Sequence, residues 1–428
     1  MLEQPEFGQL LKTLRQQRGL SQAEVAEGGM STAYLSRLES GARRPTAKVL
    51  DHLTRRLGVP ASVFQGTHTS LLGQALASAS SSDDTDDAIR LLGEAVQAES
   101  GEDLSLRWLS LWQLAQLHAK QGKRQGELAA ARELTELSDR LEVSTLQVRS
   151  RTLLARCLRA IGDIDEARAV AQAALITADN GAVPAADTIR AQLVLVSVEA
   201  ESGLITEARR LADQLLEPID ALPPVLRAEA LWSAANVRIR QGDYPGAVEL
   251  LQRALTELPS HVDLVLRLRL AASSLYLQMT PRRVTEAQQW LAEAERALGL
   301  FGGPLHRQEL LVIKAHLAFY QRDLVQAKML CEQLTDALPQ LTFRDRIRLE
   351  VLAHQIRILE GDREAGVRRI EELALEAQNA SNVHLASEIW RTLAETLAWA
   401  SERQAAPASG SPRTSTRESP PEADSAPR

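Results

Sequence analysis

The sequence has 428 residues, of which 44% are hydrophobic, 25% charged and 4% aromatic, and its formal net charge is −7. This length predicts about two to four globular domains. Two cysteines, Cys157 and Cys331, exclude a disulfide framework or a CxxC metal site. No apolar run reaches the roughly 18–20 residues of a membrane span, and the first residues lack the basic and apolar regions of a secretory signal. We therefore expect a cytoplasmic protein without a membrane partner.

The charge is distributed unevenly along the chain. Residues 1–66 carry nine Lys and Arg against six Asp and Glu, whereas the rest of the chain is acidic. A basic segment attached to an acidic chain favours the binding of a polyanion by the basic part.

Residues 5–64 predict five short helical segments. The first begins at Pro5, which suits the first turn of a helix, and ends before Gly19. An S-x-x-E capping box at residues 21–24 begins the second. The third covers residues 31–40, with Leu35 and Leu38 facing inward. The fourth follows residues 45–46 and ends at Gly58, and a short turn follows it.

Two short helices joined by a glycine turn suggest a helix-turn-helix. The segment GLSQAEVAEGGMSTAYLSRLESGARRPTAKVLDHLTRRLGV resembles the DNA-binding domain of the Cro/phage-repressor (XRE-like) family, over essentially all of residues 5–66. The resemblance implies that double-stranded DNA is a partner. The turn between the second and third helices is about one residue shorter than the family pattern. Met30 is expected to fill the buried position there, and the register at the start of the third helix stays open.

The third helix carries the candidate base contacts. Because Leu35 and Leu38 face the core, residues about half a turn away face outward. In the family the equivalent positions enter the major groove. A bidentate contact between Arg37 and guanine would give about 1–3 kcal/mol of discrimination, and the alternative is a solvated or phosphate-bound Arg37. The candidates are Thr32, Ala33, Ser36 and Arg37.

Other residues of the same domain are candidates for positioning the DNA or the helices. The resemblance implies that Gln22, at the start of the second helix, binds a phosphate, with a solvated residue as the alternative. It also implies a structural ion pair between Arg15 and Glu39. The candidate phosphate contacts are Gln22, Ser31, Tyr34, Arg43, Arg44 and Lys48.

Residues 67–400 are predicted to be helical and repetitive. Leu and Ala recur at helical spacing, and a small residue after a turn returns at 88, near 128, and at 167, 208, 247, 287, 327 and 366. A period of about 40 residues indicates a helical solenoid. The pattern resembles tetratricopeptide repeats, most completely at residues 228–259, and an irregular helical bundle is the alternative.

The predicted fold class is therefore all-α. It consists of a five-helix helix-turn-helix domain at 1–66 and an open, right-handed, tetratricopeptide-like solenoid of about eight helix pairs at 67–400. Residues 401–428, rich in Pro and Ser, are expected to be disordered.

The inner surface of the repeats is the candidate ligand groove. In tetratricopeptide repeats the first helix of each pair lines the concave face, and the resemblance transfers that position to this chain. Amide side chains there can hold a peptide backbone, and arginines can clamp a carboxylate. For each residue the alternative is an ordinary surface position. The candidates are Trp112, Arg149, Arg156, Arg190, Trp232, Asn236, His316, Arg348 and Gln355.

No motif in the sequence supports catalysis or a cofactor. A phosphate loop, a GxGxxG loop, HExxH and GxSxG are all absent, and the histidines are scattered.

The favoured hypothesis is a sequence-specific transcriptional regulator, not an enzyme. Its repeats would form a homodimer and bind a peptide or small-molecule effector or a protein partner. This layout resembles the peptide-pheromone-responsive regulators of Gram-positive bacteria. The alternative is an interaction scaffold that the helix-turn-helix localises to DNA, and an enzyme with the repeats as substrate platform ranks third.

Overall fold

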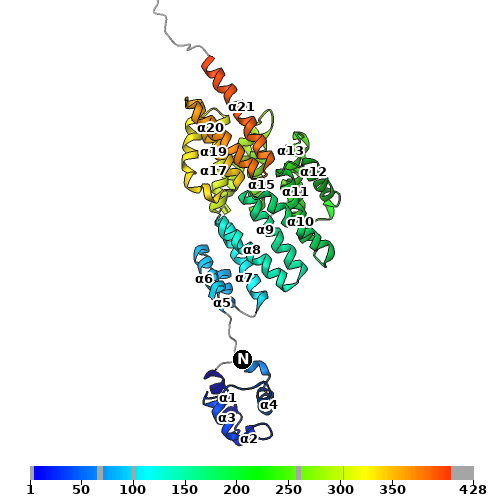
Figure 1. Ribbon diagram of the computed structural model, residues 1–428, viewed down its shortest axis with the longest axis vertical. Helices are drawn as coiled ribbons and strands as arrows, with labels where there is room; N and C mark the ends of the chain where they lie inside the picture. Colours follow the sequence, from blue (N-terminus) through cyan, green and yellow to red (C-terminus); the bar gives the residue numbers. More distant parts are fainter. Residues whose placement is uncertain (1–3, 65–70, 99–102, 257–261, 302, 406–428) are drawn as a thin grey trace, which may run out of the picture. The chain divides into compact units, whose positions relative to one another are not determined.

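The computed structural model describes residues 4–64, 71–98, 103–256, 262–301 and 303–405 (Figure 1). These residues form helices and connecting turns, and no strand occurs among them. The all-α fold class is therefore confirmed. The chain divides into two compact units, residues 1–100 and 101–428. Within the described ranges, no helix combines the length and the apolar character needed to cross a bilayer.

The first unit begins with the predicted helix-turn-helix segments. They are α1 (Glu6–Gln17), α2 (Gln22–Ala26), α3 (Thr32–Glu39), α4 (Ala47–Leu57) and a 3₁₀ turn (Ala61–Val63). The capping box at the start of α2 is present in both directions, and the hydroxyls of Ser31 and Thr46 cap α3 and α4. The local signals in the sequence therefore place all of these elements correctly.

One apolar core holds this domain together. Phe7 of α1 packs on Phe64 after the last turn, with ring centroids 5.2 Å apart, and Leu35 and Leu38 of α3 are fully buried between them and α4. Met30 packs partly buried against the same core, as predicted. Burial of Leu35 and Leu38 fixes which face of α3 is left exposed.

Two further helices complete the first unit. Helices α5 (Leu71–Ser81) and α6 (Thr85–Ala98) pack on each other as a hairpin. This hairpin is the first predicted repeat, and Ala88 is buried at the predicted small position. The boundary between the two compact units falls after this hairpin, at residue 100.

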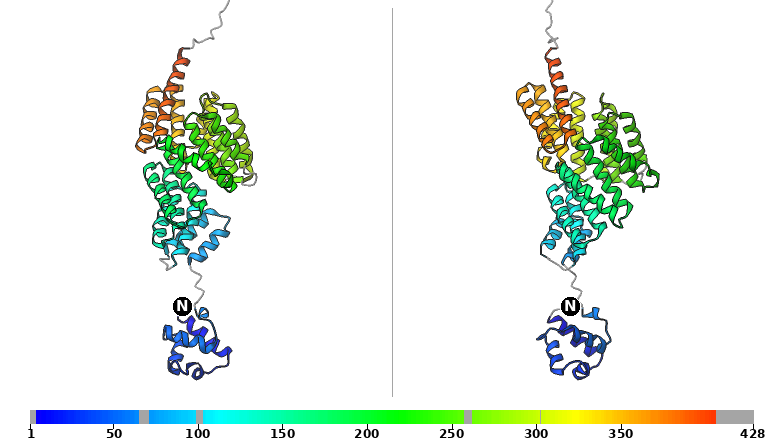
Figure 2. Two further views of the ribbon diagram at one scale, coloured as in Figure 1. Left: turned by 90° about the vertical axis from the view of Figure 1, so that its right-hand side faces the viewer. Right: turned by 45° about the vertical axis from the view of Figure 1, so that its right-hand side comes forward.

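The second unit is a stack of antiparallel helix pairs (Figure 2). With α5 and α6 the chain has eight pairs among its described residues, followed by a single helix, which agrees with the predicted number. The members of the unit are α7 (Leu104–Lys120), α8 (Arg124–Leu141), α9 (Ser144–Ile161), α10 (Ile164–Asn180), α11 (Ala185–Glu201), α12 (Ile205–Leu216), α13 (Pro224–Arg240), α14 (Tyr244–Thr256), α15 (Val262–Gln278), α16 (Val284–Phe301), α17 (Pro304–Tyr320), α18 (Leu324–Gln333), α19 (Phe343–Glu360), α20 (Arg363–Asn379) and α21 (Val383–Ala405).

The repeat positions behave as the sequence predicts, with one exception. Ala167, Ala208 and Ala247 are fully buried. In α8 the equivalent position is taken by Glu127, which is buried and lies 3.6 Å from Arg156. The small residues near 128 are Ala130 and Ala131, which are buried, while the position five residues after the glycine carries Glu127.

The superhelix returns on itself, which corrects the expectation of an open solenoid. Helix α19 packs on α9 and α21 packs on α11, and we call these contacts the closing seam. Ser381 donates a hydrogen bond of 2.6 Å to Asp165, and Arg124 donates one of 3.2 Å to the Gln340 carbonyl. Contacts between residues about 200 positions apart thus join the part of this unit from α8 to α11 to the part from Gln340 to α21.

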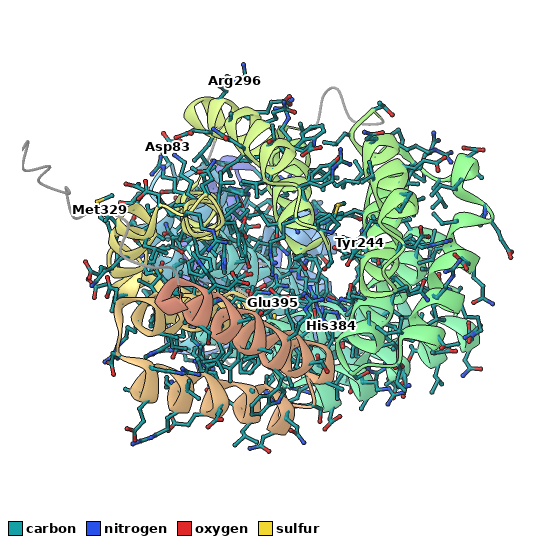
Figure 3. All side chains as sticks on the ribbon, turned by 90° about the horizontal axis from the view of Figure 1, so that it is seen from above. Asp83, Tyr244, Arg296, Met329, His384 and Glu395 are labelled. Atoms are coloured by element: carbon teal, nitrogen blue, oxygen red, sulfur yellow. The ribbon has the colours of Figure 1, made fainter. Side chains whose placement is uncertain are left out.

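Helix α21 covers the last repeat. Seen from above, it carries His384 and Glu395 along its length (Figure 3), and Glu395 pairs with Arg282 at 2.7 Å. The helix continues to Ala405. The predicted end of the repeats at residue 400 is therefore a few residues early, and the rest of the expected disordered tail, residues 406–428, lies outside the described residues.

Candidate nucleic-acid interface and ligand groove

The outward face of α3 is exposed over its whole length. Thr32, Ala33, Ser36 and Arg37 are all exposed, opposite the buried Leu35 and Leu38. Arg37 donates from Nε to the Ala33 carbonyl at 3.2 Å, so its guanidinium lies along the helix. The structure therefore gathers the four predicted base-contact residues on one surface.

The predicted phosphate contacts border this face. Arg43, Arg44 and Lys48 are exposed in and after the loop that follows α3. The Tyr34 hydroxyl lies 3.4 Å from the Arg44 carbonyl, and the Ser31 hydroxyl accepts the Tyr34 N–H at 3.2 Å. The cations around α3 give the surface the positive charge that a phosphate backbone attracts.

Arg15 and Glu39 form the predicted structural ion pair. Arg15 Nε lies 2.6 Å from Oε1 of Glu39, and its Nη2 lies 3.1 Å from Oε2, so the pair is bidentate. Both side chains are largely buried. Burial acts to raise the pKa of Glu39, but the hydrogen bonds from Arg15 and Gln22 lower it overall. The pair fixes α3 to α1.

Gln22 has a partner that the sequence did not indicate. Its side-chain Nε2 donates to Glu39 Oε2 at 2.8 Å, and the residue is half-buried. Gln22, which was predicted to bind a phosphate, therefore forms a structural hydrogen bond between α2 and α3. The backbone N–H groups at the start of α2 are not part of this bond.

The larger cavity of the second unit brings together six predicted groove residues. It has a volume of about 620 Å³ and is lined by α7, α9, α11, α13 and α15. The predicted residues are Trp112, Arg149, Arg156, Arg190, Trp232 and Asn236; Trp108, Arg159, Asp187, Glu229 and Arg267 line it as well.

Ion pairs organise the arginines of this cavity. Asp187, which is buried, accepts a hydrogen bond from Arg149 Nε at 3.0 Å and lies 3.5 Å from Arg190. Burial raises the pKa of Glu229, although the surrounding arginines act to lower it. Asp187 was missed because it lies in the first turn of α11, three residues before Arg190, the repeat position that was counted.

Aromatic side chains complete the wall. Trp108 and Trp112 are stacked with centroids 5.2 Å apart, and the indole N–H of Trp108 donates to Ser150 Oγ at 2.9 Å. At the other side, the Arg267 guanidinium lies 5.3 Å from the Trp232 ring centre. Indole faces and guanidinium groups offer a ligand both stacking and charge.

A smaller cavity of about 270 Å³ continues from the larger one. The two share Trp232, Asn236 and Arg267. The predicted groove residues His316 and Arg348 line the smaller cavity, together with Arg240, Glu309, Arg344, Asp345 and Glu388. The groove therefore extends from α7 to α21.

Gln355 lies outside both cavities, so its assignment to the groove is wrong. Its Nε2 donates to Thr396 Oγ1 at 2.7 Å, and both residues are buried between α19 and α21. The concave position is covered here because α21 packs over the last repeat.

The described residues hold no cluster of His, Cys, Asp and Glu that could bind a metal ion. Cys157 and Cys331 are buried thiols, and burial raises the pKa of Cys331 to about 12. A thiol with a raised pKa is a poor nucleophile at neutral pH.

Comparison with known proteins identifies the N-terminal part. Residues 6–64 match the family described as helix-turn-helix domain. The first domain is a helix-turn-helix domain. A curated protein of Sinorhizobium fredii (strain NBRC 101917 / NGR234), the uncharacterized helix-turn-helix-type transcriptional regulator y4dJ, is 51% identical over 47 residues. The match covers 11% of this chain and 61% of that protein.

Solved structures resemble the chain only distantly. PlcR of Bacillus thuringiensis, in complex with the peptide PapR7 and DNA, is 15% identical, covers 71% of this chain and 98% of its own, and has a TM-score of 0.34. A tetratricopeptide repeat protein from Parabacteroides merdae ATCC 43184 is 16% identical, covers 61% of this chain and 90% of its own, and has a TM-score of 0.42. ComR of Streptococcus suis is 14% identical, covers 72% of this chain and 94% of its own, and has a TM-score of 0.28. At these identities and scores the likeness carries no argument about function.

Proposed function

We propose that this chain is a sequence-specific DNA-binding transcriptional regulator. The observation that carries the proposal is the exposed face of α3, where Thr32, Ala33, Ser36 and Arg37 lie beside exposed cations. Side chains of these types read base edges in the major groove, and the surrounding Arg and Lys hold the phosphates. Such a regulator acts on the chromosome, in the cytoplasm of a bacterium.

The repeats supply the regulated part of the proposal. A groove with indole faces and arginines suits a peptide or small-molecule effector, because it combines apolar contact with anchoring of an anionic group. A homodimer would place two copies of α3 about one helical turn apart on the DNA, or a multiple of it. A single α3 of eight residues reaches only a few base pairs.

The experiment is selection of bound duplexes from a random library with the full-length protein, followed by light scattering of the complex. We expect paired half-sites and two protein chains per duplex. A monomer that binds one half-site with nanomolar affinity would contradict the dimer, and a library without enrichment would contradict sequence-specific binding.

The effector part is tested separately. In one titration, a cell extract fraction that raises the melting temperature of the repeats should also change the affinity for the selected DNA, because linkage couples the two. Arg190→Gln should weaken both effects. Arg210→Gln is the matched control, since Arg210 is equally exposed and paired three residues away but does not line the groove. Stabilisation without a change in DNA affinity would favour the interaction scaffold.

A further inference from the structure

The smaller cavity is lined by Arg240 and Arg344, whose side chains are 7% and 20% exposed and whose hydrogen-bonding capacity is not used by the protein. Arg240 Nη2 lies 3.7 Å from Glu201, and Arg344 Nη2 lies 3.6 Å from Glu388, which is outside hydrogen-bonding distance in both cases. Among the described residues, neither arginine donates a hydrogen bond, and Nε of Arg344 is buried without a partner.

The carboxylates near these arginines already have other partners. Glu388 is held by Arg348 at 2.6 Å, and Glu201 by Arg159 at 2.8 Å. Asp345 accepts a hydrogen bond from the Thr342 hydroxyl at 2.6 Å. The protein therefore leaves Arg240 and Arg344 without an acceptor of their own, although a buried guanidinium group is costly unless it is hydrogen-bonded.

A third unpartnered group faces the same cavity. His316 lines it from α17, and its Nε2 is buried with no hydrogen-bond partner. Burial and the positive charge of Arg348 lower the pKa of His316 to about 4, and burial and the positive charge of Arg344 lower the pKa of Arg240 to about 9. Both shifts have the direction expected where positive charge is insufficiently neutralised.

We propose that the cavity lined by Arg240, Arg344 and His316 is a binding site for an anionic group, a phosphate or a carboxylate. Guanidinium groups bind such oxygens with paired, charge-assisted hydrogen bonds, and the neutral imidazole can donate one more. The anion replaces the acceptors that the protein does not provide.

The position of the site gives its occupancy a structural consequence. Arg240 ends α13, whereas Arg344 lies at the start of α19, three repeats further along the chain. Arg344 also lies near Glu388 of α21, the helix that packs on α11 at the closing seam. An anion held by both arginines therefore joins the two halves of the superhelix and stabilises the seam.

Two sources can supply the anionic group: a free ion, or the charged end of an organic effector. The larger cavity shares Trp232 and Asn236 with this site. An effector in the groove can thus place its phosphate or carboxylate on the arginines and an apolar part near Trp232. In this form the inference deepens the effector-binding part of the proposed function, and its test does not involve DNA.

The experiment uses the full-length protein in a thermal-shift and calorimetric titration with inorganic phosphate and with phenyl phosphate, against potassium chloride of equal ionic strength. We expect saturable stabilisation by phosphate. Equal affinities for the two probes assign the site to a free ion, and tighter binding of phenyl phosphate assigns it to an organic effector. Slower hydrogen exchange in α21 should accompany binding in either case.

Arg344→Gln separates an anion site from a structural arginine. Because Arg344 donates no hydrogen bond and lies close to Arg348, we expect no loss of melting temperature without phosphate and about tenfold weaker phosphate binding. Arg346→Gln is the control on the same helix: Arg346 is similarly buried but paired with Glu350 and Glu376, so stability should fall while phosphate binding is unchanged.

Three results would overturn the proposal. In the first, neither probe stabilises the protein more than chloride does. In the second, the Arg344→Gln variant binds phosphate as tightly as the unmodified protein. In the third, Arg344→Gln lowers the melting temperature in phosphate-free buffer. None of them would affect the DNA-binding proposal. Arg240→Gln repeats the test from α13, where Glu201 keeps Arg159 as its partner.

Discussion

Gln22 donates a hydrogen bond of 2.8 Å to Glu39, the carboxylate that also receives Arg15. These three side chains come from α2, α3 and α1 in turn. One buried carboxylate therefore sets the orientation of the helix that would read the DNA. A DNA-binding defect in a variant of any of the three can arise through the position of α3 rather than through a lost contact.

Replacing Glu39 should destabilise the helix-turn-helix domain. Glu39→Gln leaves the largely buried Arg15 without its counter-charge, and we expect a loss of about 3 kcal/mol. Hydrogen exchange of the α1 and α3 amides measures it. Glu27→Gln is the control, because its pair with Arg56 is exposed and should change stability by less than about 1 kcal/mol. Equal losses of stability in the two variants would show that the buried Arg15–Glu39 pair stabilises the domain no more than the exposed Arg56–Glu27 pair.

Arg37 and Arg44 should affect DNA binding in different ways. Arg37→Ala should relax preference at one base pair at a cost of about 1–3 kcal/mol. Arg44→Ala should weaken binding to all sequences and reduce the salt slope by about one unit. Binding to a panel of single-base variants at several salt concentrations measures both. If Arg37→Ala weakens every sequence equally, Arg37 contacts a phosphate and the register of α3 on the DNA is different.

Two glycines in equivalent turns provide a test of the closing seam. Gly162 and Gly242 both have left-handed backbones, so alanine should cost about 1–2 kcal/mol at either position. A Cβ at 162 would also lie 2.5 Å from the Phe343 ring of α19, whereas a Cβ at 242 meets nothing within 4 Å. Gly162→Ala should therefore destabilise the repeats more than Gly242→Ala in urea unfolding. Equal losses would mean that α19 moves away from α9 without cost.

Stability of the repeats should fall as the pH falls below 6.5. The pKa of His316 is about 4 in the folded protein, against 6.5 for an exposed histidine. Between these values the unfolded chain binds more protons, so this contribution is complete above pH 6.5 and is lost towards pH 4. His316→Leu should reduce the slope of unfolding free energy against pH near pH 5 by about one proton. An unchanged slope would show that His316 is protonated in the folded state.

The sequence was sufficient where structure depends on neighbours in the chain. The capping box at Ser21, the cap at Ser31 and the glycine after α4 are local signals, and the helices they delimit are where they were predicted. The inward position of six groove residues also followed from the repeat frame. Asn236 and Trp232, for example, lie at their predicted face because the frame there is regular.

Prediction failed where structure depends on the sum of many small rotations between repeats. The hydrogen bond between Ser381 and Asp165 needs the correct twist at every intervening pair, which no local pattern encodes. Gln355 was misplaced for the same reason, since the repeat frame does not show that α21 covers it. Gln22 was incompletely assigned because its partner, Glu39, is near only after folding.

The contacts between α9 and α19 and between α11 and α21 also constrain how this protein can change its length. Solenoid proteins commonly gain or lose repeats during evolution, since each unit contacts only its neighbours. Here a duplicated or deleted pair between residues 180 and 343 would shift the last helices by a whole unit against the first. Gly203, whose added Cβ would lie 3.2 Å from Val383, would then face a different residue. Natural relatives that keep this arrangement should therefore vary in their loops and termini, and hardly at all in the number of helix pairs between the two surfaces.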